Sequence, residues 1–243
     1  MFLENLGLDA MDPIRLGRYW EEALGTTTLT EAPGIFETRL DLDGTAYLDL
    51  CFAQVPAPNR SSQRLHLDLR GGRQQTEVAE HLRGLGASDL DIGQGEVPWT
   101  VLADVEGGVF CVMEERDAYA ATGPLAALPL EVADPARDAE FWSWLSGWVP
   151  ADGSVPHTLR HPSLRGPLLE LVPEPAPKRA DAKNPIHLDV RLEPGDDADE
   201  VAAGIEARGG RELHPDWGEL PWRVFQDPSG NELCVLPAAG PAA

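Results

Sequence analysis

Hydrophobic and polar residues alternate strictly in two short segments that repeat one another. Residues 64–70 read Arg-Leu-His-Leu-Asp-Leu-Arg and residues 185–191 read Pro-Ile-His-Leu-Asp-Val-Arg, so the same central positions recur 121 residues later. A period of two is typical of a β-strand with one buried face. We therefore expect each segment to turn its aliphatic side chains to a core and its other side chains to the opposite face. The polar pairs on that face are His66 with Asp68, and His187 with Asp189.

Helix signals repeat with nearly the same spacing. Asp-Pro opens an amphipathic segment at residues 12–13 and again at residues 134–135, and Gly25 and Gly147 stand where each helix should end. Aspartate is a preferred N-cap, proline suits the first helical position and glycine suits the C-terminal turn. A second amphipathic pattern follows each His-containing strand. The order strand, helix, strands is thus predicted four times along the chain.

The closing strands of the two halves also match, at an offset of 123 residues. They share Pro, Trp, Asp, Gly and Cys at corresponding positions, Pro98-Trp99 with Pro221-Trp222 among them. A repeat of this length indicates a duplicated domain. We predict an α+β fold of two tandem domains, residues 1–122 and 123–243, with helices outside curved mixed sheets.

Composition narrows the classes of partner. The 243 residues carry 41 acidic side chains against 19 Lys and Arg, a formal net charge of −22. Such a field repels phosphate backbones and anionic lipids, so we expect neither nucleic-acid nor membrane-surface binding. The three cysteines lie far apart, and no apolar run approaches the ~20 residues of a membrane span. We therefore expect an acidic, cytoplasmic protein whose partner is a small-molecule ligand.

Several of these motifs together resemble a known superfamily. They are the Asp-Pro helix start, the His-Leu-Asp-Leu strand, a helix ending in Leu-Gly-Ala, and the closing Asp-Pro-Ser-Gly-Asn-Glu-Leu-Cys-Val of residues 227–235. The chain resembles the glyoxalase-like branch of the vicinal oxygen chelate superfamily, which includes glyoxalase I, bleomycin-resistance proteins, fosfomycin-resistance enzymes and extradiol dioxygenases. The resemblance covers residues 1–120 and 125–238. It implies paired βαβββ units whose sheets curl around a small-molecule cavity, often with a divalent metal.

The resemblance also suggests where metal ligands would lie. The family's fifth-strand histidine is present as His66 and His187, and Glu170 occupies a fourth-strand ligand position in the second half. The usual eighth-strand glutamate is replaced by Cys234. Imidazole, carboxylate and thiolate together suit Zn²⁺, with Fe, Mn or Ni as other divalent candidates. The alternative is that no cofactor binds and that Cys234 is a buried apolar residue.

Without a metal, the same face offers proton-transfer chemistry. His187 titrates near neutral pH and can act as acid or base, with Asp189 and Glu232 as further catalytic candidates. For ligand contacts, Trp99 and Trp222 are candidates for stacking on a planar group, with core packing as the alternative. The polar pair of the first half, His66 and Asp68, completes the set of ligand-binding candidates.

Two functions remain open from the sequence. One is an enzyme, a lyase, isomerase or hydrolase that uses His187; the other is a protein that sequesters a drug or natural product without turnover. Residues 104–109 have lost the Pro, Asn and Glu of the second closing motif, and Asp49 replaces Glu170. We therefore expect the second domain to hold the active pocket and the first to be degenerate. Two fused domains can imitate a dimer, so we expect a monomer with pseudo-dimeric domains, or else a homodimer.

Overall fold

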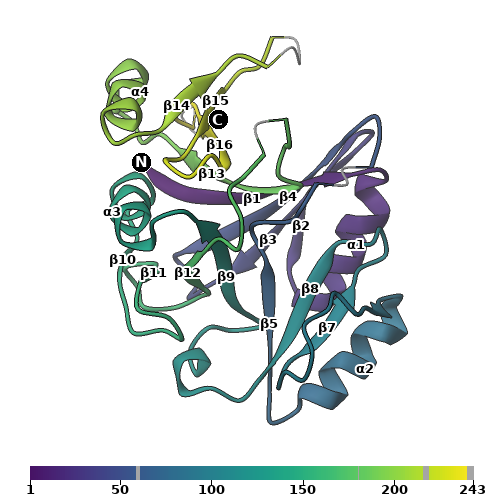
Figure 1. Ribbon diagram of the computed structural model, residues 1–243. Coiled ribbons are helices and arrows are strands. Elements are labelled where there is room, and N and C mark those ends of the chain that lie inside the picture. Colours follow the sequence, from purple (N-terminus) through teal and green to yellow (C-terminus); the bar gives the residue numbers. More distant parts are fainter. Residues whose placement is uncertain (59–60, 180, 216–218, 240–243) are drawn as a thin grey trace.

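The computed structural model describes residues 1–58, 61–179, 181–215 and 219–239, and these form four units of the same order (Figure 1). Unit 1 contains β1 (Phe2–Ala10), α1 (Pro13–Leu24), β2 (Thr27–Ala32), β3 (Ile35–Asp41) and β4 (Tyr47–Gln54). Unit 2 contains β5 (Leu67–Gly72), α2 (Gln75–Leu85), β6 (Ser88–Asp89), β7 (Thr100–Ala103) and β8 (Val109–Glu114), followed by the short 3₁₀ helix η1 (Asp117–Tyr119).

The second half of the chain repeats this order. Unit 3 contains β9 (Leu125–Val132), α3 (Pro135–Ser146), β10 (Val149–Pro150), β11 (Thr158–Arg160) and β12 (Leu168–Pro173). Unit 4 contains β13 (Ile186–Arg191), α4 (Ala198–Ala207), β14 (Arg211–Leu213), β15 (Arg223–Gln226) and β16 (Glu232–Leu236). The predicted α+β fold with four βαβββ units is confirmed.

The four units pair crosswise into two open sheets. The sheet called A here has the order β14-β15-β16-β13-β1-β4-β3-β2, and the sheet called B has the order β10-β11-β12-β9-β5-β8-β7-β6. Sheet A therefore joins unit 1 to unit 4, and sheet B joins unit 2 to unit 3. The joining strands run antiparallel, β1 against β13 and β5 against β9. Each sheet thus takes one unit from each half of the chain.

The helix signals in the sequence act as expected. The Asp12 side chain accepts a hydrogen bond from the Arg15 N–H at 3.1 Å, and Asp134 accepts one from the Arg137 N–H at 3.2 Å. Gly25 follows α1 in the left-handed conformation at φ 63°. A glycine adopts this conformation without the steric cost that a Cβ would bring.

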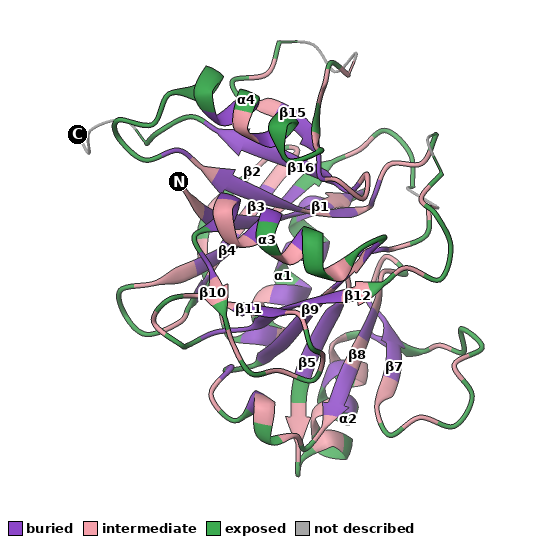
Figure 2. Cartoon of the chain, turned by 60° about the vertical axis from the view of Figure 1, so that its left-hand side comes forward, coloured by how far each residue is buried: buried purple, intermediate pink, exposed green. Residues whose placement is uncertain are grey.

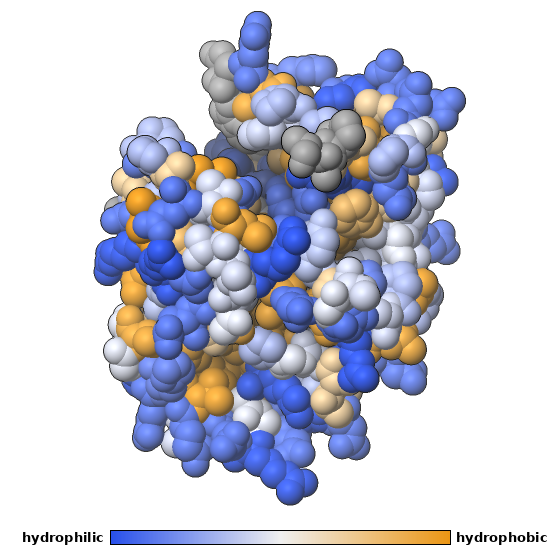
Figure 3. Space-filling view, turned by 180° about the vertical axis from the view of Figure 1, so that it is seen from behind, coloured by the Kyte–Doolittle hydropathy of each residue, from blue (hydrophilic) through white to orange (hydrophobic). Residues whose placement is uncertain are grey.

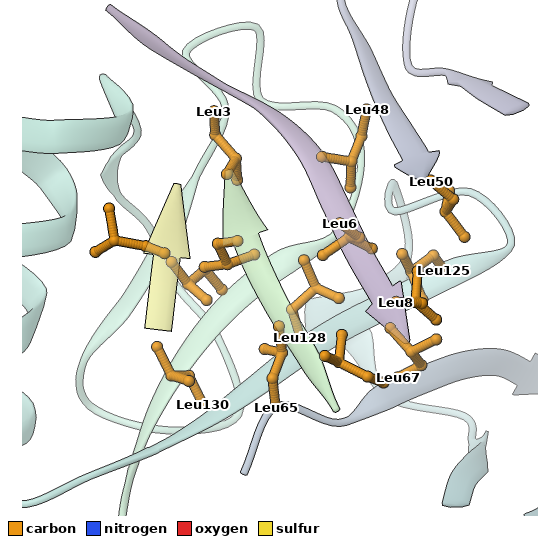
Figure 4. Packing of buried hydrophobic residues seen from close by; sticks show 14 of the residues in the cluster. Leu3, Leu6, Leu8, Leu48, Leu50, Leu65, Leu67, Leu125, Leu128 and Leu130 are labelled. Carbon is orange, nitrogen blue, oxygen red and sulfur yellow. The ribbon is translucent and has the colours of Figure 1, made fainter. Parts of the chain in front are cut away.

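The alternating strands turn their aliphatic side chains to a common core. On β13, Ile186, Leu188 and Val190 are buried in a cluster that draws on both sheets and all four helices. The close view in Figure 4 shows leucines of β1, β4, β5 and β9 packed together in this cluster, and Figure 2 shows the burial along the strands of both sheets. The opposite face of each sheet is therefore free to carry polar side chains.

One tryptophan in each half of the chain links sheet A to sheet B. Trp20 of α1 donates from Nε1 to Asp104 Oδ2 at 3.3 Å, and Trp142 of α3 donates to Asp227 Oδ2 at 3.2 Å. Both rings are only 1% exposed. Each aspartate also accepts backbone N–H groups of its own turn, for example from Gly108 to Asp104 at 2.9 Å. One buried carboxylate thus shapes a turn and anchors a helix of the other sheet's unit.

In the part of the chain that the structure describes, no helix has the length and apolar character needed to cross a membrane.

Two helical glycines provide a test of the packing between α1 and sheet A. A Cβ at Gly17 would lie 2.1 Å from Phe36 Cδ1, whereas a Cβ at Gly84 of α2 would meet nothing within 4 Å. We expect Gly17→Ala to lower the free energy of unfolding by about 1–3 kcal/mol through overpacking. Gly84→Ala, the matched control, should raise it by roughly 0.5–1 kcal/mol through helix propensity. Urea unfolding of both variants measures this, and equal effects would contradict the packing described.

Candidate functional site

The polar face of sheet A borders a cavity of about 890 Å³, called here the sheet A cavity. Its walls come from both halves of the chain, since β1, β3 and β4 of unit 1 and β13, β15 and β16 of unit 4 all contribute side chains. Its lining includes Gly7, Ile35, Glu37, Cys51, Ala53, Lys183, His187, Asp189, Arg191, Trp222, Val224, Glu232, Cys234 and Leu236. The second domain was expected to hold the active pocket, and it supplies β13, β15 and β16 to this cavity, but β1 of the first half pairs with β13 and adds the other wall.

The imidazole of His187 lies over Gly7 of the neighbouring strand, where any larger side chain would collide with the ring. Gly7 of β1 is its partner in the antiparallel register. A Cβ at Gly7 would lie 2.6 Å from both Cε1 and Nε2 of the imidazole, closer than real Cβ atoms come to other heavy atoms. The ring therefore leans from β13 across β1 because Gly7 leaves room for it.

The imidazole makes its polar contacts through one ring nitrogen. His187 Nε2 lies 3.2 Å from Asp189 Oδ1 and 3.7 Å from Cys234 Sγ. Asp189 Oδ1 also accepts the Cys234 N–H at 3.2 Å, which fixes the carboxylate between the two strands. The other ring nitrogen, Nδ1, is buried and has no hydrogen-bond partner among the described residues. The ring thus keeps one unused donor or acceptor.

Burial and charge act on the His187 pKa in opposite directions. Burial lowers it by penalising the charged ring, while the charge and the hydrogen bond of Asp189 raise it, and the net effect is a pKa above the usual histidine value. On the thiol the two effects act in the same direction: burial, and then Asp189, raise the Cys234 pKa. Cys234 is therefore a protonated thiol at neutral pH, and it lacks the thiolate character of a nucleophile.

The same three side chains could hold a metal ion. His187, Asp189 and Cys234 each offer a ligand atom, and these atoms all lie within 4.8 Å of one another. Imidazole, carboxylate and thiol form a donor set that suits Zn²⁺, which would displace the thiol proton on binding. The donor set therefore fits a divalent metal of this kind.

Glu170 does not belong to this group, which corrects the ligand set expected from the sequence. It lies on β12, which pairs with β9 in sheet B. There its Oε1 accepts the Ser154 N–H at 3.0 Å, and burial raises the pKa of its carboxyl. The sequence placed Glu170 and His187 in one domain, but the crosswise pairing of the units puts them on different sheets.

Glu232 lines the cavity with both carboxylate oxygens already engaged. Oε1 pairs with the Lys178 ammonium group and accepts from Gln226 Nε2 at 3.2 Å, and Oε2 accepts the Asn184 N–H at 3.0 Å. The side chain thereby ties the start of β16 to the segment before β13. These contacts give Glu232 a structural role, and the catalytic role expected for it stays a prediction.

The corresponding face of sheet B is built differently. His66 turns its Nε2 toward Glu131 Oε1 at 3.7 Å, while burial raises the pKa of Asp68 to about 7. Met113 and Tyr119 join a small apolar cluster on this face, with Trp99 packed against it. The protein's own side chains thus cover part of this face, and a cavity of about 560 Å³ adjoins Arg70 and Tyr119.

The two tryptophans expected to stack on a ligand are in different environments. Trp222 lines the sheet A cavity and is 37% exposed. Trp99 belongs to sheet B, where the Arg116 guanidinium lies 5.8 Å from its ring centroid. Of the pair, only Trp222 is placed to touch a ligand in the cavity.

Three further cavity residues lie on unit 1 and were not singled out by the sequence. Gly7, Glu37 and Cys51 form one row across the strands, with Glu37 opposite Cys51 and Cys51 beside Gly7. The alternation of β3 and β4 already assigns Glu37 and Cys51 to their polar faces. The sequence gives no sign that these faces adjoin β13, because that pairing joins residues about 180 positions apart.

Comparisons with known proteins agree with this architecture. A family model described as a glyoxalase-like domain matches residues 5–113 and again residues 127–236. Glyoxalase I from Zea mays is similar in structure, with a TM-score of 0.64 and 16% identity over 97% of this chain and 92% of that chain. A putative dioxygenase from Bacillus subtilis subsp. subtilis str. 168 has a TM-score of 0.60 and 14% identity, over 99% of this chain and 86% of that chain. A search of curated proteins found no match.

Identities this low show a shared fold and leave the chemistry to the residues of the site. The family itself is shown by the two matches, which together span most of the sequence and both halves of each sheet. The chain therefore belongs to the family of glyoxalase-like domains, and it contains two of them.

Proposed function

We propose that the chain binds a small organic molecule in the sheet A cavity and that His187 exchanges a proton with it. The observation that carries this proposal is a half-buried imidazole, held by Asp189, on the wall of a cavity of about 890 Å³. Ligand sites commonly measure about 300–1,000 Å³, with mainly apolar walls and a few convergent polar groups. The cavity has both properties.

Proton transfer is supported by the way His187 is held. Asp189 contacts Nε2 at 3.2 Å and stabilises the charged ring, while Nδ1 keeps a vacant hydrogen-bonding position. A positioned histidine of this kind is the commonest general acid or base. The reaction classes that need only such a proton shuttle are eliminations, isomerisations and hydrolyses, so we propose a lyase, an isomerase or a hydrolase.

The metal-bound form is an alternative state of the same site. His187, Asp189 and Cys234 would hold the ion, and a bound Zn²⁺ would supply Lewis-acid polarisation of a ligand oxygen. In that state His187 is a ligand and its role as acid or base passes to other groups. Both states use the same cavity and the same strands.

Sequestration without turnover is the second candidate function. It is favoured by Trp222, which lines the cavity beside Val224 and keeps 37% of its surface exposed. An aromatic side chain at such a wall holds planar apolar groups without taking part in chemistry. The two candidates share the binding step and differ in whether His187 changes the bound molecule.

Filling the cavity tests the binding step. Ala53 of β4 is exposed and lines the cavity, so Ala53→Trp should occupy part of it without disturbing the core. We expect molecules that bind the wild type in a screen of small organic compounds by ligand-observed NMR to lose at least about tenfold in affinity. Ala203→Trp, which adds the same side chain on the exposed surface of α4, is the control. Hits that bind both variants equally would place binding elsewhere.

The effect of Asp189 on His187 can be measured by NMR titration of chelator-treated protein. The His187 resonance should titrate above the usual value of about 6.5, and Asp189→Asn should lower its pKa. A raised folded pKa stabilises the protein fully below the unfolded value, and this contribution is lost as the pH rises through the folded pKa. The stability of wild type relative to Asp189→Asn should therefore be greater at about pH 5 than at about pH 8. An unchanged difference would contradict the pairing.

Thermal unfolding with added Zn²⁺ tests the metal-bound state. Binding to the folded protein alone should stabilise it by about 2.7 kcal/mol at a free metal concentration 100 times the dissociation constant. Cys234→Ala should remove this shift because one of the three ligand atoms is lost. Cys111→Ala changes the corresponding cysteine of sheet B and should leave the shift intact. A shift that survives in Cys234→Ala would mean that the zinc binds at another place.

A further inference from the structure

We propose that the sheet A cavity selects ligands that carry a protonated amine, and that Glu37 is the counter-charge for this amine. The inference rests on the proposed function, because it names the class of ligand for the same cavity. Its basis is the charge that remains in the cavity after the internal ion pairs have formed.

Among the described residues of the lining, Lys183 and Arg191 are the Lys and Arg side chains, and both are already paired with acids. Lys183 forms an ion pair with Asp9. Arg191 forms two contacts with Glu4 Oε2, from Nε at 2.6 Å and from a terminal nitrogen at 2.5 Å, and its other terminal nitrogen donates to the Pro237 carbonyl at 2.8 Å. Neither guanidinium nor ammonium is therefore arranged to receive a carboxylate or phosphate of a ligand.

Not every acidic side chain of the lining has a basic partner. Glu232 has Lys178 as its partner, Asp181 has Arg179, and Asp189 has His187. Glu37 forms no ion pair with any described residue. Its neighbours are the Cys51 thiol, whose pKa is raised by burial and then by Glu37, and the Arg191 guanidinium, which feels the charge of Glu37 but forms its ion pair with Glu4. Among the described residues, one carboxylate in the cavity wall thus lacks an ion-pair partner of its own.

Glu37 lies at one end of the row that has His187 at the other. The row runs from Glu37 on β3 through Cys51 on β4 and Gly7 on β1 to His187 on β13. Three strand spacings put the outer α-carbons about 14 Å apart. The imidazole leans over Gly7 toward the glutamate side, so the charged groups at the two ends are closer than their α-carbons. A small molecule can therefore place an amine at Glu37 and a reacting group near His187.

The walls beside this row indicate an apolar body for the ligand. Ile35 lies two residues before Glu37 on β3 and pairs with Ala53 of β4, while Val224, Leu236 and Trp222 line the cavity from unit 4. The exposed indole of Trp222 can also attract a cation through its ring face. An amine attached to an aliphatic or aromatic body matches both the charge and the walls.

The charge of the whole molecule favours the same ligands. A net charge of −22 raises the local concentration of cations and lowers that of anions around the protein. The exterior also lacks one continuous apolar area on the face seen in Figure 3, where hydrophobic and hydrophilic side chains are interspersed. The negative charge of the protein therefore attracts cationic amphipathic molecules toward the cavity and repels anionic ones.

Three probes of one shape but different charge test this inference. They are 4-phenylbutylamine, 4-phenylbutan-1-ol and 4-phenylbutyrate, titrated into the full-length protein by calorimetry near neutral pH. We expect the amine to bind at least about tenfold more tightly than the alcohol, and the butyrate to bind most weakly. Glu37→Gln should lower amine affinity by at least about tenfold and leave alcohol affinity unchanged.

Two variants separate a local effect of Glu37 from the general field. Glu206→Gln removes the same charge from the exposed surface of α4 and should leave the affinities of all three probes unchanged. Glu37→Lys should reverse the order, so that the butyrate binds more tightly than the amine. Far-UV circular dichroism and Tm confirm that each variant is folded. If Glu37→Gln does not fold, Glu37→Ala removes the charge in its place.

The outcomes distinguish this inference from the proposed function. If the alcohol binds and the amine binds no better, or if Glu37→Gln and Glu206→Gln weaken amine binding equally, the amine selectivity is wrong while small-molecule binding stands. If none of the three probes binds the wild type, the amine selectivity is wrong, and the compound screen with Ala53→Trp decides the proposed function separately.

Discussion

The antiparallel contact between β1 and β13 is the constraint on which the candidate site depends. It brings together two strands from different halves of the chain, and Gly7 pairs with His187. Because Gly7 has no side chain, the imidazole can lean across β1 and meet Asp189 and Cys234 with Nε2. A larger residue at position 7 would displace the ring and with it the contacts that set its pKa.

Crosswise pairing of the four units has a second consequence. The Trp20–Asp104 and Trp142–Asp227 hydrogen bonds join a helix of one sheet's unit to a turn of the other within each half of the chain. The strand pairs β1–β13 and β5–β9 join the two halves. Every unit therefore contacts the other unit of its own half through a Trp–Asp hydrogen bond and a unit of the other half through strand pairing. The sheet A cavity requires residues from both halves.

Duplication has produced two related sheets with different uses of their polar faces. On sheet B, Met113, Tyr119 and Trp99 pack into an apolar cluster, and His66 pairs with Glu131. On sheet A, the corresponding face keeps a cavity whose wall includes His187 and also Glu37, which forms no ion pair with any described residue. Burying apolar side chains stabilises a sheet face, whereas an open cavity gives up that stabilisation. We interpret sheet B as mainly structural and sheet A as the functional sheet.

The sequence by itself determined the elements, because capping residues, periodicity and repeats act over short distances: the Asp12 and Asp134 caps, the buried Leu188 and the duplication could all be read from it. It also identified His187, Asp189 and Cys234. Only the tertiary structure decided the partners of these residues, since strand pairing joins positions about 180 apart and no local pattern encodes it. That pairing separated Glu170 from His187, engaged Glu232 in structural contacts, and placed Gly7 and Glu37 in the cavity.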